Sequence, residues 1–152
     1  TVAVENEGSP RDLLVARFGA AGDEQMMTAV RQLGDEEMQG LAVAADGSMI
    51  VGARTPGGAL SLARLDATGR VIERKALDPT AGSQLRGLSI APDGDLLLLT
   101  QDGAEAELRR VATGGLDIGE PVQRLAMTAS SLAVAADGRV AVGGRRNGDG
   151  VR

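Results

Sequence analysis

Short apolar runs separated by Asp-Gly pairs set the pattern of this chain. Apolar side chains alternate along Leu41–Ala45, so that Leu41 and Val43 share one face of an expected strand. The pair Asp46-Gly47 follows, and a second apolar run begins at Met49. An Asp-Gly pair between two such runs predicts a β-hairpin with a type I′ turn, which requires positive φ at both central residues.

Two phrases of this pattern recur in one register. LAVAADG at 41–47 returns as LSIAPDG at 88–94 and unchanged at 132–138, at spacings of 47 and 44 residues. LSLARLDATG, which contains Arg64, is matched by LLVARFGAAG around Arg17 and more loosely by AELRRVATGG around Arg110. Self-similarity with a period of about 40–50 residues is typical of β-propeller blades.

Each repeat predicts four strands. The first precedes the Asp-Gly turn, the second follows it, the third is the arginine phrase, and the fourth varies in sequence. The second strand is apolar on both faces, which predicts sheets that are covered on both sides, as in radially stacked blades. The expected second strands are Met49–Val51, Leu96–Leu99 and Val140–Val142, and the expected fourth strands include Val71–Leu77 and Ile118–Leu125.

One segment is ambiguous. Met26, Met27, Val30 and Leu33 have the spacing of an amphipathic helix. The segment nevertheless occupies the position of a fourth strand, because the gap from the arginine phrase to the next repeat is the same 19 residues in the first two units. We expect a strand, since the register of the repeat outweighs the local pattern.

The repeats predict an all-β fold of four-stranded β-propeller-type blades, with roughly three and a half repeats of about 44–47 residues. We expect a single repeat domain over 1–152. It is divided into a partial blade at 1–40, blades at 41–87 and 88–131, and a partial blade at 132–152.

This number of blades does not close a ring, because propellers have about 4–8 blades. We favour a fragment, or the resolved part, of a longer repeat protein. A second interpretation is a homodimer in which two chains complete one ring, although Thr1–Val4 already occupies a second-strand position and would be duplicated there. A third interpretation is an open β-array.

The stretch LAVAADGSMIVGARTPGGALSLARLDATGRV resembles the bacterial delta-60-type β-propeller repeats. Their usual form is an apolar strand, an Asp-Gly turn, a second strand with a Val-x-Gly ending, and an ALARL phrase closed by glycine. The resemblance covers nearly the whole chain and implies a bacterial secreted or surface-associated protein. The third unit departs from it at Glu107 and Arg109, where we expect an exposed edge or face.

Composition excludes several classes of function. Net charge is −5 without a basic stripe, and Phe18 is the sole aromatic residue, so nucleic-acid binding is not expected. No apolar run approaches the roughly 20 residues of a membrane span, and no signal peptide is visible. Histidine and cysteine are both absent, which removes the commonest general base and thiolate chemistry.

Acidic and glycine-rich stretches give weak signals for chemistry. Asp35, Glu36 and Glu37 are expected in a solvated loop. Asp93 with Asp95, and Asn147-Gly-Asp149-Gly, match only part of a calcium loop, and the turn explains Asp93 better. Gly57-Gly58 and Gly143-Gly144 lack the context of a phosphate-binding loop and are interpreted as turn glycines.

The recurring arginines Arg17, Arg64 and Arg110 are the sharpest candidates for a role. One interpretation is a ring of positive charge that lines a channel. The interpretation we favour is structural: each guanidinium binds turn carbonyls or a turn aspartate of a neighbouring blade, since arginine has five donors for such contacts.

We therefore expect a non-catalytic propeller scaffold or interaction module of a bacterial surface, secreted or appendage-associated protein. No catalytic residue, cofactor or metal site is expected. The expected partner is a protein, or a second copy bound through open blade edges as a homodimer. The expected location is extracellular or the cell envelope, with the cytoplasm left open. The alternative is a piece of a propeller enzyme whose active site lies in blades outside this chain.

Overall fold

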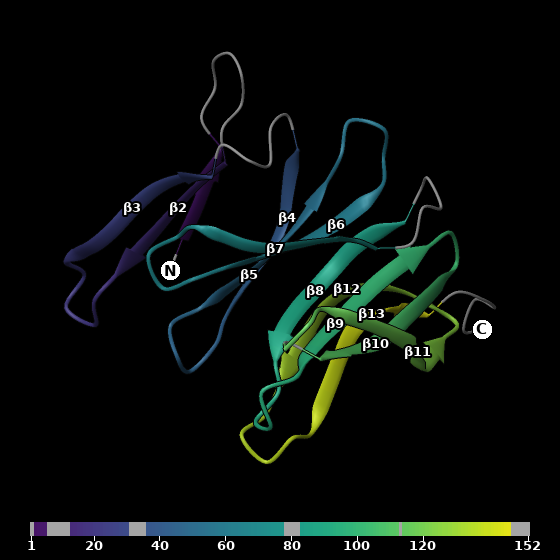
Figure 1. The fold of residues 1–152 in the computed structure, drawn as a ribbon. Coiled ribbons are helices and arrows are strands. Elements are labelled where there is room, and N and C mark those ends of the chain that lie inside the picture. Colours follow the sequence, from purple (N-terminus) through teal and green to yellow (C-terminus); the bar gives the residue numbers. More distant parts are fainter. Residues whose placement is uncertain (1, 6–12, 31–35, 78–82, 113, 147–152) are drawn as a thin grey trace. The chain divides into compact units, whose positions relative to one another are not determined.

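The computed structural model describes residues 2–5, 13–30, 36–77, 83–112 and 114–146, and within them the secondary structure consists of strands (Figure 1). The predicted all-β fold is confirmed. The strands are β1 (Val2–Glu5), β2 (Leu13–Phe18), β3 (Glu24–Val30), β4 (Glu37–Val43), β5 (Met49–Arg54), β6 (Leu60–Leu65), β7 (Val71–Ala76), β8 (Gln84–Ile90), β9 (Leu96–Asp102), β10 (Glu105–Ala112), β11 (Asp117–Leu125), β12 (Met127–Val134) and β13 (Val140–Arg146).

The strands form four antiparallel sheets in two compact units. The first unit, Thr1–Ala81, holds a three-stranded sheet β1-β2-β3 and a four-stranded sheet β4-β5-β6-β7. The second unit, Gly82–Arg152, holds a four-stranded sheet in the order β11-β10-β9-β8 and the pair β12-β13. The two four-stranded meanders are the predicted complete blades. A single repeat domain over 1–152 stays a prediction.

The ambiguous segment is a strand, as the register of the repeat predicts. β3 pairs with β2 along its length, with Met27 opposite Ala16 and Met26 opposite Arg17. Met26 packs against the core of its unit, whereas 52% of Met27 is exposed, which is the two-residue alternation of a strand. Leu33 lies outside the described residues.

The turns after β4, β8 and β12 share one geometry, and it differs from the predicted type I′ turn. In the turn after β4, the Gly47 amide donates to the Ala44 carbonyl at 3.0 Å and the Ala44 amide donates to the Ser48 carbonyl at 2.9 Å. Gly47 has a φ of 82°, whereas Leu116 alone among the described non-glycine residues has a positive φ. Asp46 therefore keeps a negative φ, and the hairpin is a type I turn followed by a glycine bulge. The Asp-Gly signal located the hairpin correctly but indicated the wrong turn type.

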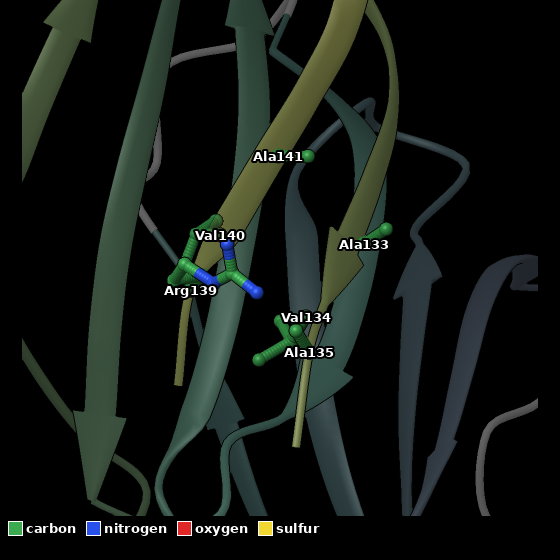
Figure 2. Close-up of a pocket in the computed structure, with 6 residues that line it drawn as sticks. All are labelled: Ala133, Val134, Ala135, Arg139, Val140 and Ala141. Atoms are coloured by element: carbon green, nitrogen blue, oxygen red, sulfur yellow. The ribbon is translucent and has the colours of Figure 1, made fainter. Parts of the chain in front are cut away.

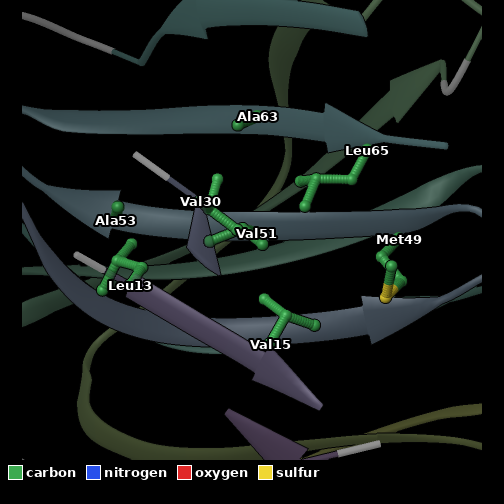
Figure 3. Packing of buried hydrophobic residues seen from close by; sticks show 8 residues of the cluster. All are labelled: Leu13, Val15, Val30, Met49, Val51, Ala53, Ala63 and Leu65. Carbon is green, nitrogen blue, oxygen red and sulfur yellow. The ribbon is translucent and has the colours of Figure 1, made fainter. Parts of the chain in front are cut away.

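The core of the first unit lies between its two sheets. Figure 3 shows side chains of β2 and β3 gathered with those of β5 and β6. Each of these apolar side chains is at most 2% exposed, and burying a leucine, valine or methionine side chain stabilises the fold by about 1.5–3 kcal/mol. The cluster consists of Leu13, Val15, Val30, Met49, Val51, Ala53, Ala63 and Leu65.

The expected burial on both faces is confirmed for β5 and β9, which are second strands of their repeats. Met49, Ile50 and Val51 on β5 are at most 1% exposed, and Leu96–Leu99 on β9 are at most 5% exposed. The same expectation is wrong for β13, where 39% of Val140 is exposed. The reason is that β13 belongs to a two-stranded sheet, so fewer neighbours cover it.

The first strand of each repeat carries an irregularity that the sequence analysis did not find. The register against the second strand shifts between Met38 and Gly40, between Leu85 and Gly87, and between Ala129 and Ser131. Each shift adds one residue to the first strand, which bends that strand and increases its twist.

Candidate functional site

The recurring arginines make three different sets of contacts. Arg110 on β10 donates from Nε to Asp95 Oδ2 at 2.8 Å and pairs through Nη2 with Asp93. Both aspartates belong to the β8–β9 turn of its own blade. The predicted bond to a turn aspartate is confirmed for Arg110, but its assignment to a neighbouring blade is wrong.

The other two arginines do not bind a turn aspartate in the same way. Arg64 pairs with Glu73 at 3.1 Å, and these two residues lie opposite each other on β6 and β7. Arg17 places Nη1 3.4 Å from where a Cβ on Gly47 would lie, so it reaches the β4–β5 turn of the next sheet. The Nε atoms of Arg17 and Arg64 are buried without a hydrogen-bond partner. The repeated sequence position therefore does not produce a repeated bond.

Glu36 corrects the prediction of a solvated acidic loop. Its side chain is 4% exposed, accepts a hydrogen bond from the Ser61 hydroxyl at 3.0 Å, and pairs with Arg74. A buried carboxylate requires such partners, since an unpaired charge in the interior is strongly unfavourable. Glu36 thus connects the start of β4 with β6 and β7. Glu37 is exposed as predicted, and Asp35 lies outside the described residues.

Gln101 is a structural residue that the sequence analysis missed. It is 4% exposed at the end of β9. Its Nε2 donates to the carbonyls of Gly103 at 3.0 Å, Glu105 at 3.1 Å and Met127 at 3.2 Å, and its Oε1 accepts the Ala129 amide at 2.7 Å. The side chain therefore joins the β9–β10 turn to β12. Arg54 stands at the equivalent position of the preceding repeat, so no recurring residue marked this site.

The remaining weak signals from the sequence are the glycine pairs and the segment from Asn147 to Asp149. Gly58 lies in the β5–β6 turn with a φ of 86°, as expected for a turn glycine. Gly143 and Gly144 are not turn glycines: they lie within β13, where a Cβ on Gly144 would come within 2.3 Å of the Thr128 carbonyl oxygen. Asn147 and Asp149 lie outside the described residues.

Glu107 and Arg109 do not lie at the edge of a sheet. Their strand, β10, pairs with β9 on one side and with β11 on the other. The two side chains are 21% and 19% exposed and form an ion pair at 2.5 Å, to which Arg124 of β11 adds a contact at 3.1 Å. Polar side chains in these positions are therefore accommodated by pairing with each other on a half-buried face.

A groove in the second unit combines apolar walls with charged groups. It has a volume of about 520 Å³ and lies between the third blade, β8–β11, and the hairpin β12–β13. Leu97, Leu108, Val122 and Val140 supply much of its apolar surface. The other lining residues are Ala91, Pro92, Asp93, Arg110, Ala136, Asp137 and Gly138.

A second concavity of about 470 Å³ lies on the hairpin β12–β13 itself (Figure 2). Small side chains, Ala133 and Ala141, form an exposed part of it. Figure 2 shows the Arg139 side chain extending from the start of β13 toward the side of Val134 and Ala135. We call the surface carrying Ala133, Ala141 and Arg139 the outer face of β12–β13.

The described residues hold no candidate for two particular kinds of site. Among the described residues, no three acidic side chains are grouped so that they could hold a metal ion. The described residues also contain no helix that is long and apolar enough to cross a membrane.

The comparisons with known proteins place the fold. No protein-family model matches the sequence, and no curated protein matches it. The chain is similar to the WD40 β-propeller domain of Doa1, at 15% identity and a TM-score of 0.62, over 94% of this chain and 43% of that one. It is also similar to the Dos1 propeller, at 12% identity and a TM-score of 0.60, over 93% of this chain and 39% of that one.

A third solved structure is similar to this chain. It is a protein of unknown function from Bacteroides caccae, at 13% identity and a TM-score of 0.55, over 92% of this chain and 48% of that one. The chain thus spans less than half the length of each of these structures. At such identities the likeness concerns the fold alone, and the fold is that of a β-propeller with four-stranded antiparallel blades.

Proposed function

We propose that this chain is a non-catalytic β-propeller module that binds protein through the outer face of β12–β13. The observation that carries the proposal is a difference between two copies of the same seven residues. In the copy at 41–47, Ala42 is 7% exposed and Ile50 on the paired strand is 1% exposed. In the copy at 132–138, the equivalent Ala133 and Ala141 are both exposed. The same two positions are therefore buried in one copy and exposed in the other.

The chemistry of the outer face suits a second β-sheet as its partner. Its small side chains allow close approach, and packed sheets lie about 10 Å apart. In the described part of the chain β13 pairs with β12 alone, and addition of a strand to a sheet is a common mode of protein recognition. We propose a blade of a second copy as the partner.

The absence of a catalytic role is also a proposal. It is supported by the use of charged side chains inside the blades: Glu36 binds Ser61 and Arg74, and Arg110 binds turn aspartates. These contacts stabilise the blades, which is a structural use of groups that could otherwise act as acids or bases. A bacterial surface, secreted or appendage-associated origin is proposed from the resemblance to delta-60-type repeats.

Sedimentation analysis over a range of concentrations tests the proposal. We expect self-association of the 152-residue chain, and we expect Ala133→Glu and Ala141→Glu to shift it toward the monomer, because each places a charge on the outer face. Ala20→Glu, on an exposed turn of the first unit, is the matched control and should leave the mass unchanged.

A chain that remains monomeric at every concentration would contradict self-association through this face. The alternative, an enzyme whose active site lies in other blades, stays a prediction. Under this alternative we expect the 152-residue chain to be a monomer and a longer parent protein to be an enzyme. A turnover assay on that longer chain would detect the enzymatic activity.

A further inference from the structure

We propose that the Asp102-Gly103 bond is a site of chemical modification, at which Asp102 converts to isoaspartate in the folded protein. The described residues contain four Asp-Gly bonds, at 46–47, 93–94, 102–103 and 137–138. Aspartate followed by glycine is prone to this reaction, because glycine has no side chain to crowd its amide nitrogen. The structure distinguishes the four bonds by the hydrogen bonds around them.

The reaction needs no partner other than water. The Gly103 nitrogen attacks Cγ of the protonated Asp102 carboxyl group, the amide gives up its proton, the carboxyl gives up its hydroxyl, and water leaves. The product is a succinimide ring. Water then adds to the main-chain carbonyl carbon of Asp102, the bond from this carbon to the nitrogen breaks, and the nitrogen regains a proton. The main chain now runs through Cβ and Cγ of Asp102, and the mass is unchanged.

In three of the four described bonds the glycine amide is already engaged. It closes the turn of its hairpin by donating to the carbonyl three residues earlier, at 3.0 Å for Gly47 and at 2.9 Å for Gly94 and for Gly138. Attack on the aspartate side chain requires this nitrogen to leave its acceptor first. The turn that the repeat encodes therefore protects its own Asp-Gly bond.

The carboxylates of these three turns are held as well. Each accepts a hydrogen bond from the amide two residues further along the chain, which fixes the side chain past the glycine rather than against its nitrogen. The bonds run from Ser48 to Asp46 at 2.9 Å, from Asp95 to Asp93 at 3.2 Å and from Arg139 to Asp137 at 3.1 Å.

Asp102-Gly103 belongs to a different kind of turn. Asp102 pairs with Glu105, so the hairpin between β9 and β10 has two turn residues, and Gly103 is the first of them with a φ of 53°. This is a type II′ turn, whose own hydrogen bond does not use the amide of the first turn residue. In the described part of the chain no acceptor binds the Gly103 amide and no donor binds the Asp102 carboxylate. Both residues are exposed to water.

Isomerisation at this bond acts on Gln101. The Gln101 Nε2 donates to the carbonyls of Gly103 at 3.0 Å and Glu105 at 3.1 Å, while its Oε1 accepts the Ala129 amide at 2.7 Å. Isoaspartate lengthens the main chain at Asp102 by a methylene group, which moves the turn carbonyls away from Nε2. The modified chain therefore holds β12 less firmly against the third blade.

Peptide mapping of the folded chain during incubation at neutral pH tests the proposal. Electron-transfer fragmentation locates isoaspartate within each peptide, and the tryptic peptide 87–109 contains both Asp93 and Asp102. We expect isoaspartate to form about fivefold faster at Asp102 than at each of the other three sites, a factor that corresponds to the roughly 1 kcal/mol of one backbone hydrogen bond. In denaturant the four rates should become similar, because the turns are lost.

Equal rates in the folded chain, or a faster reaction at Asp46, Asp93 or Asp137, overturn the proposal. Asp102→Glu keeps the charge but would have to close a larger ring, so it should form no isoaspartate at this position. Asp46→Glu is the matched control and should leave the rate at Asp102 unchanged. If Asp102→Glu does not fold, the comparison of the four sites within the parent chain still decides.

Hydrogen exchange at the Ala129 amide tests the consequence for Gln101. The incubated parent chain should lose protection at Ala129 in proportion to its isoaspartate at 102, whereas Asp102→Glu incubated in the same way should keep it. Unchanged protection in the isomerised chain would overturn the link to Gln101.

This site does not depend on the proposed function, because the reaction takes place within one chain. Ala141→Glu, which we expect to be a monomer, should therefore form isoaspartate at Asp102 as fast as the parent chain does. A chain that never self-associates would contradict the proposed function and leave this expectation in place. A rate at Asp102 that falls in Ala141→Glu to that of the other sites would contradict the role of the turn.

Discussion

The segments 41–47 and 132–138 have the same sequence but different surroundings. Both form a strand that leads into the same turn, with glycine φ values of 82° at Gly47 and 84° at Gly138. Ala42 is buried in the first segment, whereas Ala133 is exposed in the second. Local conformation is therefore encoded in the seven residues, whereas the burial of the same side chain differs between the two copies.

The sheets of each unit are also joined differently. In the first unit the junction is an apolar cluster in which Met49 and Val51 pack against Leu13 and Val15. In the second unit a smaller apolar cluster around Leu99 is accompanied by the buried amide of Gln101. A repeat protein can thus keep its blade and still vary the contact between blades, since each junction is a separate set of residues.

The largest effect is expected at the position where the junctions differ in packing. Met49→Ala should destabilise the first unit by about 2–5 kcal/mol, because it leaves a cavity among fully buried side chains. Val140→Ala, at the equivalent exposed position, should cost less than about 1 kcal/mol. Chemical denaturation combined with hydrogen exchange measures each unit. Equal losses at both positions would show that the two junctions are packed alike.

A smaller effect is expected from the polar junction. Gln101→Leu should destabilise the second unit by about 3 kcal/mol, because the Ala129 amide and the Met127 carbonyl lose a buried partner. Gln123→Leu is the matched control, since Gln123 is exposed on β11, and it should change stability by less than about 0.5 kcal/mol. If both variants unfold at the same denaturant concentration, Gln101 does not join the sheets.

The smallest effect is expected at Ser48, the residue that follows the turn at Asp46-Gly47. A hydrogen bond from the Ser48 hydroxyl, at 2.6 Å, is the main cause that lowers the pKa of Asp46 below its usual value of 3.8. Because the folded-state pKa is lowered, the stabilisation is present above pH 3.8 and is lost as the pH falls below it through the folded-state pKa. Ser48→Ala should move the pKa of Asp46 back toward 3.8 in an NMR titration.

Asp66 provides an internal control for that titration. Its pKa is lowered chiefly by the hydroxyl of Thr68, which Ser48→Ala does not touch. The pKa of Asp66 should therefore stay low in the variant. A pKa of Asp46 that does not move would mean that the serine hydroxyl is not its main stabilising partner.

Much of the fold could be predicted from the sequence because its signals are local and repeated. The spacing of the Asp-Gly pairs located the hairpins, and the common register identified β3 as a strand against the helical spacing of Met26, Met27 and Val30. The type I′ turn was wrong, because a type I turn with a glycine bulge needs positive φ at Gly47 alone.

The candidate sites were less predictable because they depend on residues that do not recur. Gln101 occurs in one repeat, so a search for repeated residues passed over it, and Asp95 was noted only as part of an incomplete calcium loop and not as a partner of Arg110. The arginines do recur, but Arg17, Arg64 and Arg110 differ in their bonds because their neighbours differ. Glu36 appeared to belong to a solvated run, and its burial depends on Ser61 and Arg74, which lie far from it in the chain.

By itself the sequence determined the strands, their order within each blade and the places where the chain turns. These follow from alternating side chains and from glycine, which act over a few residues. The tertiary structure alone decided which identical segment is buried, which junction is closed and which groove is open. Those outcomes depend on how many strands cover each segment and on where an arginine finds its carboxylates, and both are set by contacts between strands that are distant in the sequence.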